Sequence, residues 1–244
     1  MAEDFGVEGR GKFYDSVGAL RDVVQNHLLQ IVALLAMEPP ITNDAEAMAN
    51  EVMKVLSSIR PFDPVKVWRG QYVGYTDEEG VVENSDTETY VSLETEIDSW
   101  RWAGVPWYIN AGKALDRTVT EAVVEFVTPP RSLFDGDSPP APNRLRFEMK
   151  PNDTIELEMQ AKVPGDEMKS QQVSLQVDHT GMETGPSPYH RLLGDALEGD
   201  KRLFARGDQV EQAWRIVQPV LDNPLPVERY PYGERGLTQP RPFR

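Results

Sequence analysis

The side chain with the clearest capacity for chemistry is that of His27, one of three histidines in the chain. It lies in the stretch RDVVQNHLLQIVALL (residues 21–35), where apolar residues recur at the spacing of one helical face. An imidazole titrates near neutral pH and can accept a proton from a substrate hydroxyl. Helical spacing alone favours a core histidine that is hydrogen-bonded to a neighbour. The residues therefore support two interpretations of His27, a core side chain and a general base.

Asp22 is the acidic residue that most closely precedes His27, five positions earlier. Over five residues an α-helix turns about 140° beyond one full revolution, so the two side chains are expected to point in different directions. We predict that Asp22 is not a direct partner of His27 on one helix face, although both could reach into one cleft at the helix end.

Lys113 is the second candidate, and it follows Gly112 in the aromatic stretch WRWAGVPWYINAGKAL (residues 100–115). A glycine in a strand indicates a bulge or a close approach of another backbone. A lysine directly after such a glycine can be aimed at a phosphate. In isolation, the pattern favours an ordinary strand end with a solvated lysine.

The elements that would position these residues change from helices to strands and back to helices. Apolar periodicity and turn residues predict helices over residues 13–36, 43–59, 187–200 and 207–222, and strands over 89–97, 119–127, 145–150, 154–163 and 172–178. We predict one α+β domain over residues 1–244, with a large, mainly antiparallel sheet and helices packed on one face. The proline-rich segment 128–143 is expected to be a hairpin loop, and the tail from residue 223 to wrap the surface.

Charge and composition exclude several classes of protein. With 25 basic and 40 acidic side chains the net charge is −15, which disfavours nucleic-acid and anionic-membrane binding. The absence of cysteine removes disulfides and fits a reducing compartment. The charged, glycine-rich N-terminus is not a signal peptide, and no apolar run approaches the ~20 residues that span a bilayer. We expect a cytoplasmic protein.

No short motif names a reaction. The glycines of DFGVEGRGKFYD (residues 4–15) follow no strand and match neither the Walker pattern nor G-x-G-x-x-G, and no metalloprotease, calcium-loop or hydrolase motif is present. The residues by themselves thus predict an α+β domain with two unusual side chains.

Longer blocks are more specific. EDFGVEGRGKFYDSVGALRDVVQNHLLQIVALLAMEPP, RGQY, RWAGVPWYINAGKAL and YHRLLGDALEGDKRLFARGDQVEQAWRIVQPVL resemble glucose-6-phosphate dehydrogenase of the bacterial type, in order and in spacing. The resemblance extends from residue 2 to about 236 and corresponds to the C-terminal, substrate-binding and dimerisation domain. It implies a large antiparallel sheet that also forms the interface of a homo-oligomer, either a dimer or a tetramer.

The resemblance also implies roles for individual residues. His27 takes the place of the general base that removes the C1-hydroxyl proton of glucose 6-phosphate as hydride leaves for the nicotinamide. Asp22 and Glu3 take the places of residues that bind sugar hydroxyls, and Lys113 that of a lysine that reaches the substrate.

Two further substrate-site positions depart from the family pattern. Thr118 stands where the family has an arginine near the substrate. Lys150 aligns with a family glutamine, and it is expected to bind substrate by supplying the missing positive charge.

The coenzyme, NADP or NAD, would be bound mainly by an N-terminal Rossmann domain. These 244 residues contain neither its glycine fingerprint nor the R-I-D-H-Y-L-G-K motif. We therefore expect the chain alone to be inactive. We also predict no structural NADP site, because the corresponding positions hold neutral or acidic residues: Asn110, Val123, Glu148, Glu156 and Glu158.

The implied activity is oxidation of glucose 6-phosphate to 6-phosphogluconolactone with NADP, in the pentose phosphate pathway. The alternative is a non-catalytic module that assembles with a full-length dehydrogenase, and a third reading is a vestigial product of gene truncation. The presence of His27, Asp22 and Lys113 argues against a pure scaffold, which has no use for them.

Overall fold

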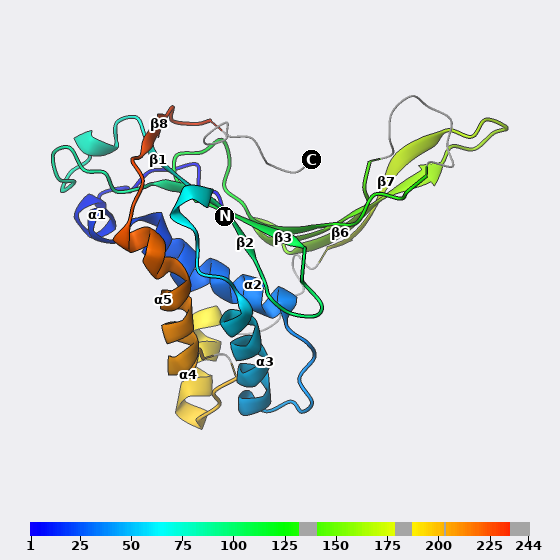
Figure 1. Cartoon of the computed structure of the whole chain (residues 1–244), viewed down its shortest axis with the longest axis horizontal. Helices are drawn as coiled ribbons and strands as arrows, with labels where there is room; N and C mark the ends of the chain where they lie inside the picture. The colour runs from blue at the N-terminus through cyan, green and yellow to red at the C-terminus, as the bar shows by residue number, and fades with distance from the viewer. Residues whose placement is uncertain (132–140, 179–186, 203, 235–244) are drawn as a thin grey trace. The chain divides into compact units, whose positions relative to one another are not determined.

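The computed structural model describes residues 1–131, 141–178, 187–202 and 204–234. They belong to two compact units, Met1–Arg117 with Pro186–Arg244, and Thr118–Gly185. The described strands form two four-stranded sheets, mostly antiparallel, one in each unit (Figure 1). The predicted α+β class is confirmed.

The sheet of the first unit has the strand order β3-β2-β1-β8. β1 (Val67–Tyr72), β2 (Tyr90–Glu96) and β3 (Pro106–Gly112) are antiparallel, with β2 confirming the strand predicted over 89–97. β8 (Glu228–Tyr230) pairs in parallel with β1. The proline-rich tail therefore contributes a strand, which its composition did not predict.

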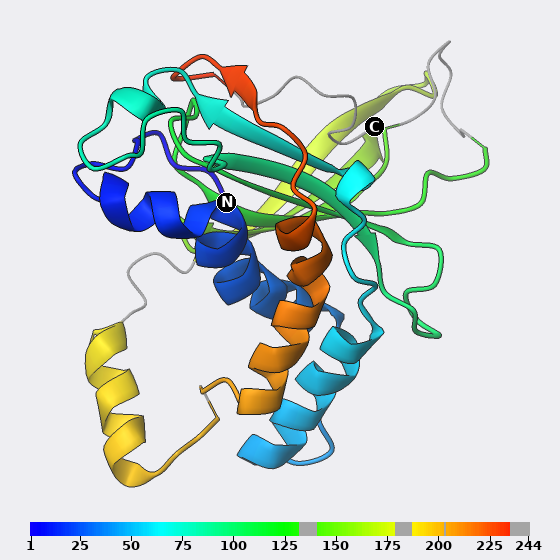
Figure 2. The same cartoon turned by 60° about the vertical axis from the view of Figure 1, so that its left-hand side comes forward.

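Helices cover one face of this sheet (Figures 1 and 2). They are α1 (Gly11–Ala19), the π-helix η1 (Leu20–Leu28), α2 (Leu29–Ala36), α3 (Ala45–Ser58) and α5 (Gly207–Asp222), with short 3-10 turns at η2 (Pro64–Lys66) and η3 (Tyr75–Asp77). The predicted helix ends are explained locally. Asp44 caps α3 by accepting the amide of Ala47 at 2.9 Å, and α2 ends three residues before Pro39.

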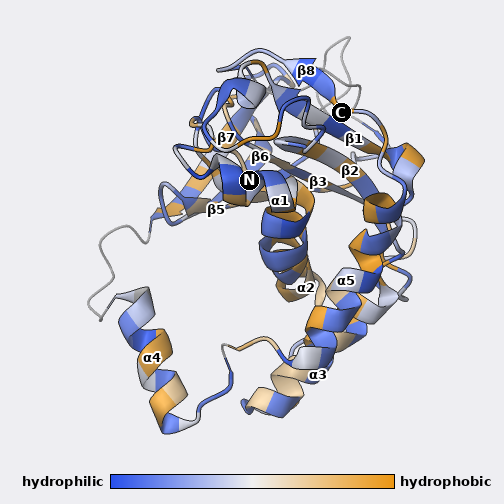
Figure 3. Cartoon of the chain, turned by 90° about the vertical axis from the view of Figure 1, so that its left-hand side faces the viewer, coloured by the Kyte–Doolittle hydropathy of each residue, from blue (hydrophilic) through white to orange (hydrophobic). Residues whose placement is uncertain are grey.

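One buried apolar cluster joins these helices to the sheet. It includes residues of η1 and α2, of α3 and α5, and of β1 to β3, such as Val24, Leu56, Val91, Ile109 and Ile216. α4 (Pro188–Glu198) begins with Pro188 at its first turn and with the Ser187 hydroxyl as its cap. Along both α4 and α5, polar and apolar residues alternate as in amphipathic helices (Figure 3).

The prediction of one continuous α-helix over residues 13–36 is wrong for the middle of that range. Gly18 has non-helical angles (φ 67°, ψ 176°), and Leu20–Leu28 is a π-helix. Since a π-helix bonds residue i to residue i+5, its turns are wider and the buried stripe shifts in phase. Leu28 and Leu29 are buried, whereas His27 is exposed and Leu34 is 56% exposed. The core interpretation of His27 is therefore wrong.

The second unit is an antiparallel sheet in the order β4-β5-β6-β7. Its strands are β4 (Thr120–Glu125), β5 (Arg144–Lys150), β6 (Thr154–Lys162) and β7 (Ser170–Asp178), as the period-2 patterns predict. The register aligns Leu145 with Leu157 and Leu175 across three strands, which places predicted apolar residues on one face. Part of the predicted loop 128–143 lies outside the described residues.

Candidate active site

Lys113 and Glu3 form an ion pair at the end of β3. The N-terminal segment runs parallel to this end, because the Glu3 amide donates to the Gly112 carbonyl and the Leu115 amide donates to the Glu3 carbonyl, each at 2.9 Å. The Lys113 side chain is only 6% exposed and that of Glu3 is 20% exposed. The expectation of a solvated lysine is therefore wrong, because burial and a carboxylate partner hold this ammonium group in place.

Aromatic rings complete the surroundings of this ammonium group. Lys113 Nζ lies 5.1 Å from the ring centroid of Phe5 and 5.3 Å from that of Tyr14, within the range of cation–π attraction. Gly112 is needed beside it, since a Cβ there would lie 2.5 Å from the ring of Tyr90. The close neighbour of this glycine is thus an aromatic side chain, whereas the sequence predicted a bulge or a close approach of another backbone.

Tyr14 connects this ion pair to the π-helix. Its hydroxyl is buried and has no hydrogen-bond partner among the described residues. Burial raises its pKa well above the ordinary value, and the charges of Glu88 and, to a lesser degree, Asp22 add to the effect. The Tyr14 ring thus lies beside the Lys113 ammonium group, and the negative charge of Asp22 contributes to the raised pKa of the Tyr14 hydroxyl.

Asp22 and His27 both lie on η1. The side chain of Asp22 is half-buried and that of His27 is exposed, with His27 Nε2 3.4 Å from the side-chain nitrogen of Asn26. Because residues i and i+5 are hydrogen-bonded in a π-helix, these two residues are about one turn apart on the same side of η1. The sequence-based separation of about 140° assumed an α-helix. In a π-helix the two side chains diverge less around the axis than they would in an α-helix, and Asp22 and His27 both belong to η1.

Lys150 belongs to the other unit and is described there alone. It is the last residue of β5, it is exposed, and it pairs in register with Thr120. Four of the five predicted site residues belong to the first unit: Glu3 and Lys113 form an ion pair, and Asp22 and His27 lie on η1.

Carboxylates dominate the positions assigned to a structural NADP in the second sheet. Glu156 and Glu158 of β6 lie on either side of Arg146, at 3.6 Å and 3.8 Å, and Arg146 is also paired with Glu121 of β4. The Arg146 guanidinium group is thus already paired with three carboxylates.

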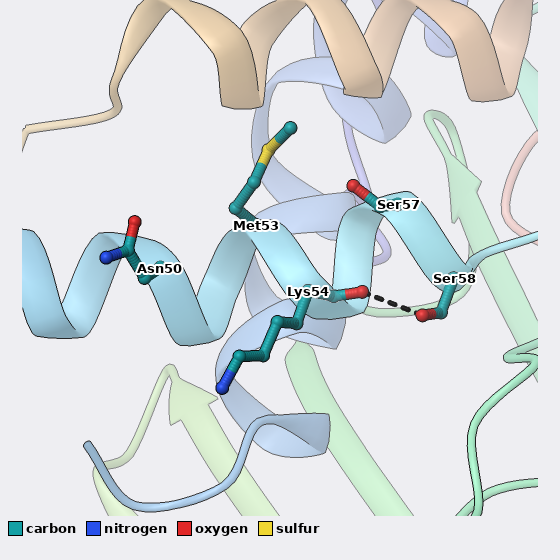
Figure 4. Close-up of a pocket in the computed structure, with 5 residues that line it drawn as sticks. All are labelled: Asn50, Met53, Lys54, Ser57 and Ser58. Atoms are coloured by element: carbon teal, nitrogen blue, oxygen red, sulfur yellow. Dashed lines mark hydrogen bonds between the residues drawn. The ribbon is translucent and has the colours of Figure 1, made fainter. Parts of the chain in front are cut away.

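A shallow pocket lies away from these residues, on α3 (Figure 4). It is lined by Asn50, Met53, Lys54, Ser57 and Ser58, and the Ser58 hydroxyl is already bonded to the Lys54 carbonyl at 2.8 Å. It contains none of the candidate residues and no paired acid and base. Within the described ranges no group of three or more His, Cys, Asp or Glu side chains could hold a metal ion, and no helix there is long and apolar enough to cross a membrane.

Comparison with known proteins decides the family. Residues 1–241 match the family model described as glucose-6-phosphate dehydrogenase, C-terminal domain. The chain belongs to this family. Glucose-6-phosphate 1-dehydrogenase 1 of Mycobacterium tuberculosis (strain ATCC 25618 / H37Rv) is 48% identical over 240 residues, which cover 97% of this chain and 50% of that protein. The enzyme of Aggregatibacter actinomycetemcomitans is 43% identical, over 91% of this chain and 48% of its own length.

Solved glucose-6-phosphate dehydrogenases share the fold. The crystal structure of glucose-6-phosphate 1-dehydrogenase from Mycobacterium avium has a TM-score of 0.87 at 47% identity, covering 97% of this chain and 51% of that one. A glucose-6-phosphate dehydrogenase in complex with its substrate glucose-6-phosphate has a TM-score of 0.85 at 35% identity, with 97% and 52% covered. This glucose-6-phosphate dehydrogenase C-terminal domain spans about half the length of the relatives it matches.

Sequence reasoning missed Tyr14, Glu88 and Arg69 as parts of this site. Arg69 lies in the RGQY block, and Glu88 lies in the polar segment that precedes β2. Both are buried in the structure, at 7% and 4% exposure. A charged residue that is buried against a distant partner leaves no local sequence signal, and here Arg69 of β1 and Glu88, which precedes β2, are 19 residues apart.

Proposed function

We propose that this chain is the substrate-binding and oligomerising half of a glucose-6-phosphate dehydrogenase, which oxidises glucose 6-phosphate to 6-phosphogluconolactone. The observation that carries the proposal is the exposure of the His27 imidazole on a helix whose neighbouring residues are core, one π-helical step from Asp22. Family membership and the named activity of the relatives support it.

His27 acts as the general base in this proposal. Its imidazole takes the proton of the substrate C1 hydroxyl while the C1 hydride leaves, so that the C1–O single bond becomes the carbonyl of the lactone. NADP, when bound, accepts that hydride. An exposed imidazole suits this task, because a general base must be within reach of the substrate hydroxyl.

Glu3, Asp22 and Lys113 bind the sugar phosphate in this proposal. Glu3 and Asp22 present carboxylate oxygens, which accept hydrogen bonds from sugar hydroxyls. Lys113 presents an ammonium group that Glu3 and two aromatic rings hold in place before substrate arrives, so little ordering entropy remains to be lost on binding. Lys150 is retained as a substrate-binding residue because its positive charge would take over from that of the family arginine replaced by Thr118.

The coenzyme is NADP or NAD, held mainly by a Rossmann domain that these 244 residues do not contain, and the chain has no structural NADP site. The absence of a structural NADP site is supported by Arg146, which is already paired with the carboxylates of Glu156 and Glu158. A 2′-phosphate there would meet uncompensated negative charge. The enzyme acts in the cytoplasm, in the pentose phosphate pathway.

The holoenzyme is a homo-oligomer, a dimer or a tetramer, assembled through the sheet. In the second unit Leu175 and Val177 of β7 are 62% and 54% exposed, although they lie in register with apolar residues of β6. Exposed apolar side chains on a sheet face are typical of surfaces that a partner covers.

The test is a fusion of this chain to the remaining half of the Mycobacterium tuberculosis relative. We expect saturable, glucose 6-phosphate-dependent reduction of NADP by the fusion and none by the chain alone. A folded fusion without activity would contradict the proposal. In that case, capture of a full-length dehydrogenase that His27→Ala leaves unchanged would favour the non-catalytic assembly module.

A further inference from the structure

The start of η1 is held from outside the helix by one residue, Glu88. Its carboxylate oxygen Oε1 accepts a hydrogen bond from the Leu20 amide at 3.0 Å, and its backbone carbonyl accepts the Ala19 amide at 3.1 Å. Leu20 is the first residue of the π-helix. Glu88 therefore takes up two amides that would bond to preceding carbonyls if α1 continued without a break.

Gly18 makes this arrangement possible. Its φ of 67° breaks the helix, and a Cβ at this position would lie 2.5 Å from Glu88 Oε1. A side chain at residue 18 would thus displace the carboxylate from the Leu20 amide. Both the break and the space for the acceptor depend on the same glycine.

Arg69 of β1 fixes the carboxylate to the sheet. Its Nη2 lies 2.7 Å from Glu88 Oε2, and the two side chains are 6% and 5% exposed. The guanidinium group also donates to the carbonyls of Asp86, at 3.0 Å, and Leu225. With its charge paired and its donors satisfied, this ion pair is a rigid attachment point for the π-helix rather than a surface contact.

We propose that Glu88 is a positioning residue for the substrate site. By accepting the Leu20 amide it sets the start and the phase of η1, and that phase places Asp22 and His27 about one turn apart on one side. If the same residues formed an α-helix, the two side chains would diverge by about 140°. The inference rests on the proposed function for the roles of Asp22 and His27, and on the contacts alone for the geometry.

Two double variants separate positioning from structural support. Arg69→Met with Glu88→Gln removes the buried charges and keeps an oxygen acceptor for Leu20. Arg69→Met with Glu88→Met removes the charges and the acceptor. Neither leaves an unpaired buried charge, so both are expected to fold, which urea unfolding checks.

Nuclear Overhauser contacts in the 244-residue chain then report the helix type. We expect contacts between residues i and i+5 of η1, including Asp22 with His27, in the Gln double variant and α-helical contacts in the Met double variant. In the fusion enzyme, kcat should fall on the order of 10- to 100-fold further in the Met double variant than in the Gln double variant, because the base is misplaced. Retention of the i to i+5 contacts in the Met double variant would overturn the inference.

If the Met double variant does not fold, Glu88→Asp decides instead. It keeps the charge paired with Arg69 but withdraws the acceptor from Leu20 by one methylene. Loss of the i to i+5 contacts is then expected, and their retention would contradict the positioning role of Glu88. An inactive wild-type fusion would refute the proposed function, whereas the contacts in the chain alone still test the positioning role.

Discussion

The ammonium group of Lys113 is paired with the carboxylate of Glu3, although 110 residues separate them in sequence. The pairing follows from backbone contacts, since the segment around Glu3 is bonded along the end of β3 on both sides of Gly112. It places a nearly buried cation beside a partly exposed anion.

Lys113→Met should destabilise the chain by about 1–3 kcal/mol, because Glu3 then loses its partner in a partly buried setting. Lys66→Met is the matched control. Lys66 pairs with Glu94 at 3.4 Å while its side chain is 48% exposed, so its loss should change the free energy of unfolding by less than about 0.5 kcal/mol. Urea unfolding measures both variants, and equal effects would show that the Lys113 pair is an ordinary surface contact.

Gly18→Ala should lower the free energy of unfolding by more than the strain of a left-handed backbone angle alone. At Gly104 the φ is 81° and nothing lies within 4 Å of an added Cβ, so Gly104→Ala should cost about 1–2 kcal/mol in strain only. At Gly18 the new Cβ also meets the Glu88 carboxylate at 2.5 Å. We expect a further loss of about 1–2 kcal/mol in thermal or urea unfolding. If Gly18→Ala and Gly104→Ala lowered the free energy of unfolding equally, the close contact between residue 18 and Glu88 would be contradicted.

Removal of two tyrosine hydroxyls should have opposite results. Tyr14→Phe deletes a buried hydroxyl without a partner and should leave the free energy of unfolding unchanged or raise it. Tyr75→Phe deletes the hydroxyl that donates to Asp15 at 2.9 Å, and should cost about 1–3 kcal/mol.

The Asp15 carboxyl gives an independent readout for the same pair. Burial would raise its pKa, but hydrogen bonds from Ser85, the Val82 amide and Tyr75 lower it. In an NMR titration, its pKa should rise in Tyr75→Phe and stay unchanged in Tyr14→Phe. A stability loss in Tyr14→Phe comparable to that in Tyr75→Phe would mean that the Tyr14 hydroxyl has a partner.

Stability should fall at alkaline pH. Burial raises the pKa values of Tyr14, Tyr72, Tyr75 and Tyr230 in the folded chain. In the unfolded chain the same phenols ionise near pH 10, so above that pH the folded state binds more protons than the unfolded state. Their contribution is therefore complete below about pH 10 and is lost as the pH rises further. Urea unfolding between pH 8 and 11 measures it, and a flat profile would contradict the burial of these rings.

The sequence predicted most helices and strands in their order because apolar periodicity is local, but it did not predict β1 or β8. The register of β5 to β7 and the end of α3 follow from it directly. It did not predict η1, because the shift from α to π depends on Glu88, 68 residues from Leu20. For the same reason spacing alone placed His27 in the core and separated it from Asp22. The family resemblance, which compares whole blocks, identified the candidate residues without their geometry.

The most direct measurement of the central claim is the turnover of the fusion enzyme with His27→Ala beside the control His190→Ala. Both histidines are exposed, so neither change should alter the free energy of unfolding by more than about 0.5 kcal/mol. If His27 is the base, its replacement should lower kcat with glucose 6-phosphate on the order of 100- to 10,000-fold, while His190→Ala keeps the wild-type rate. Equal activity of the two folded variants would contradict the account.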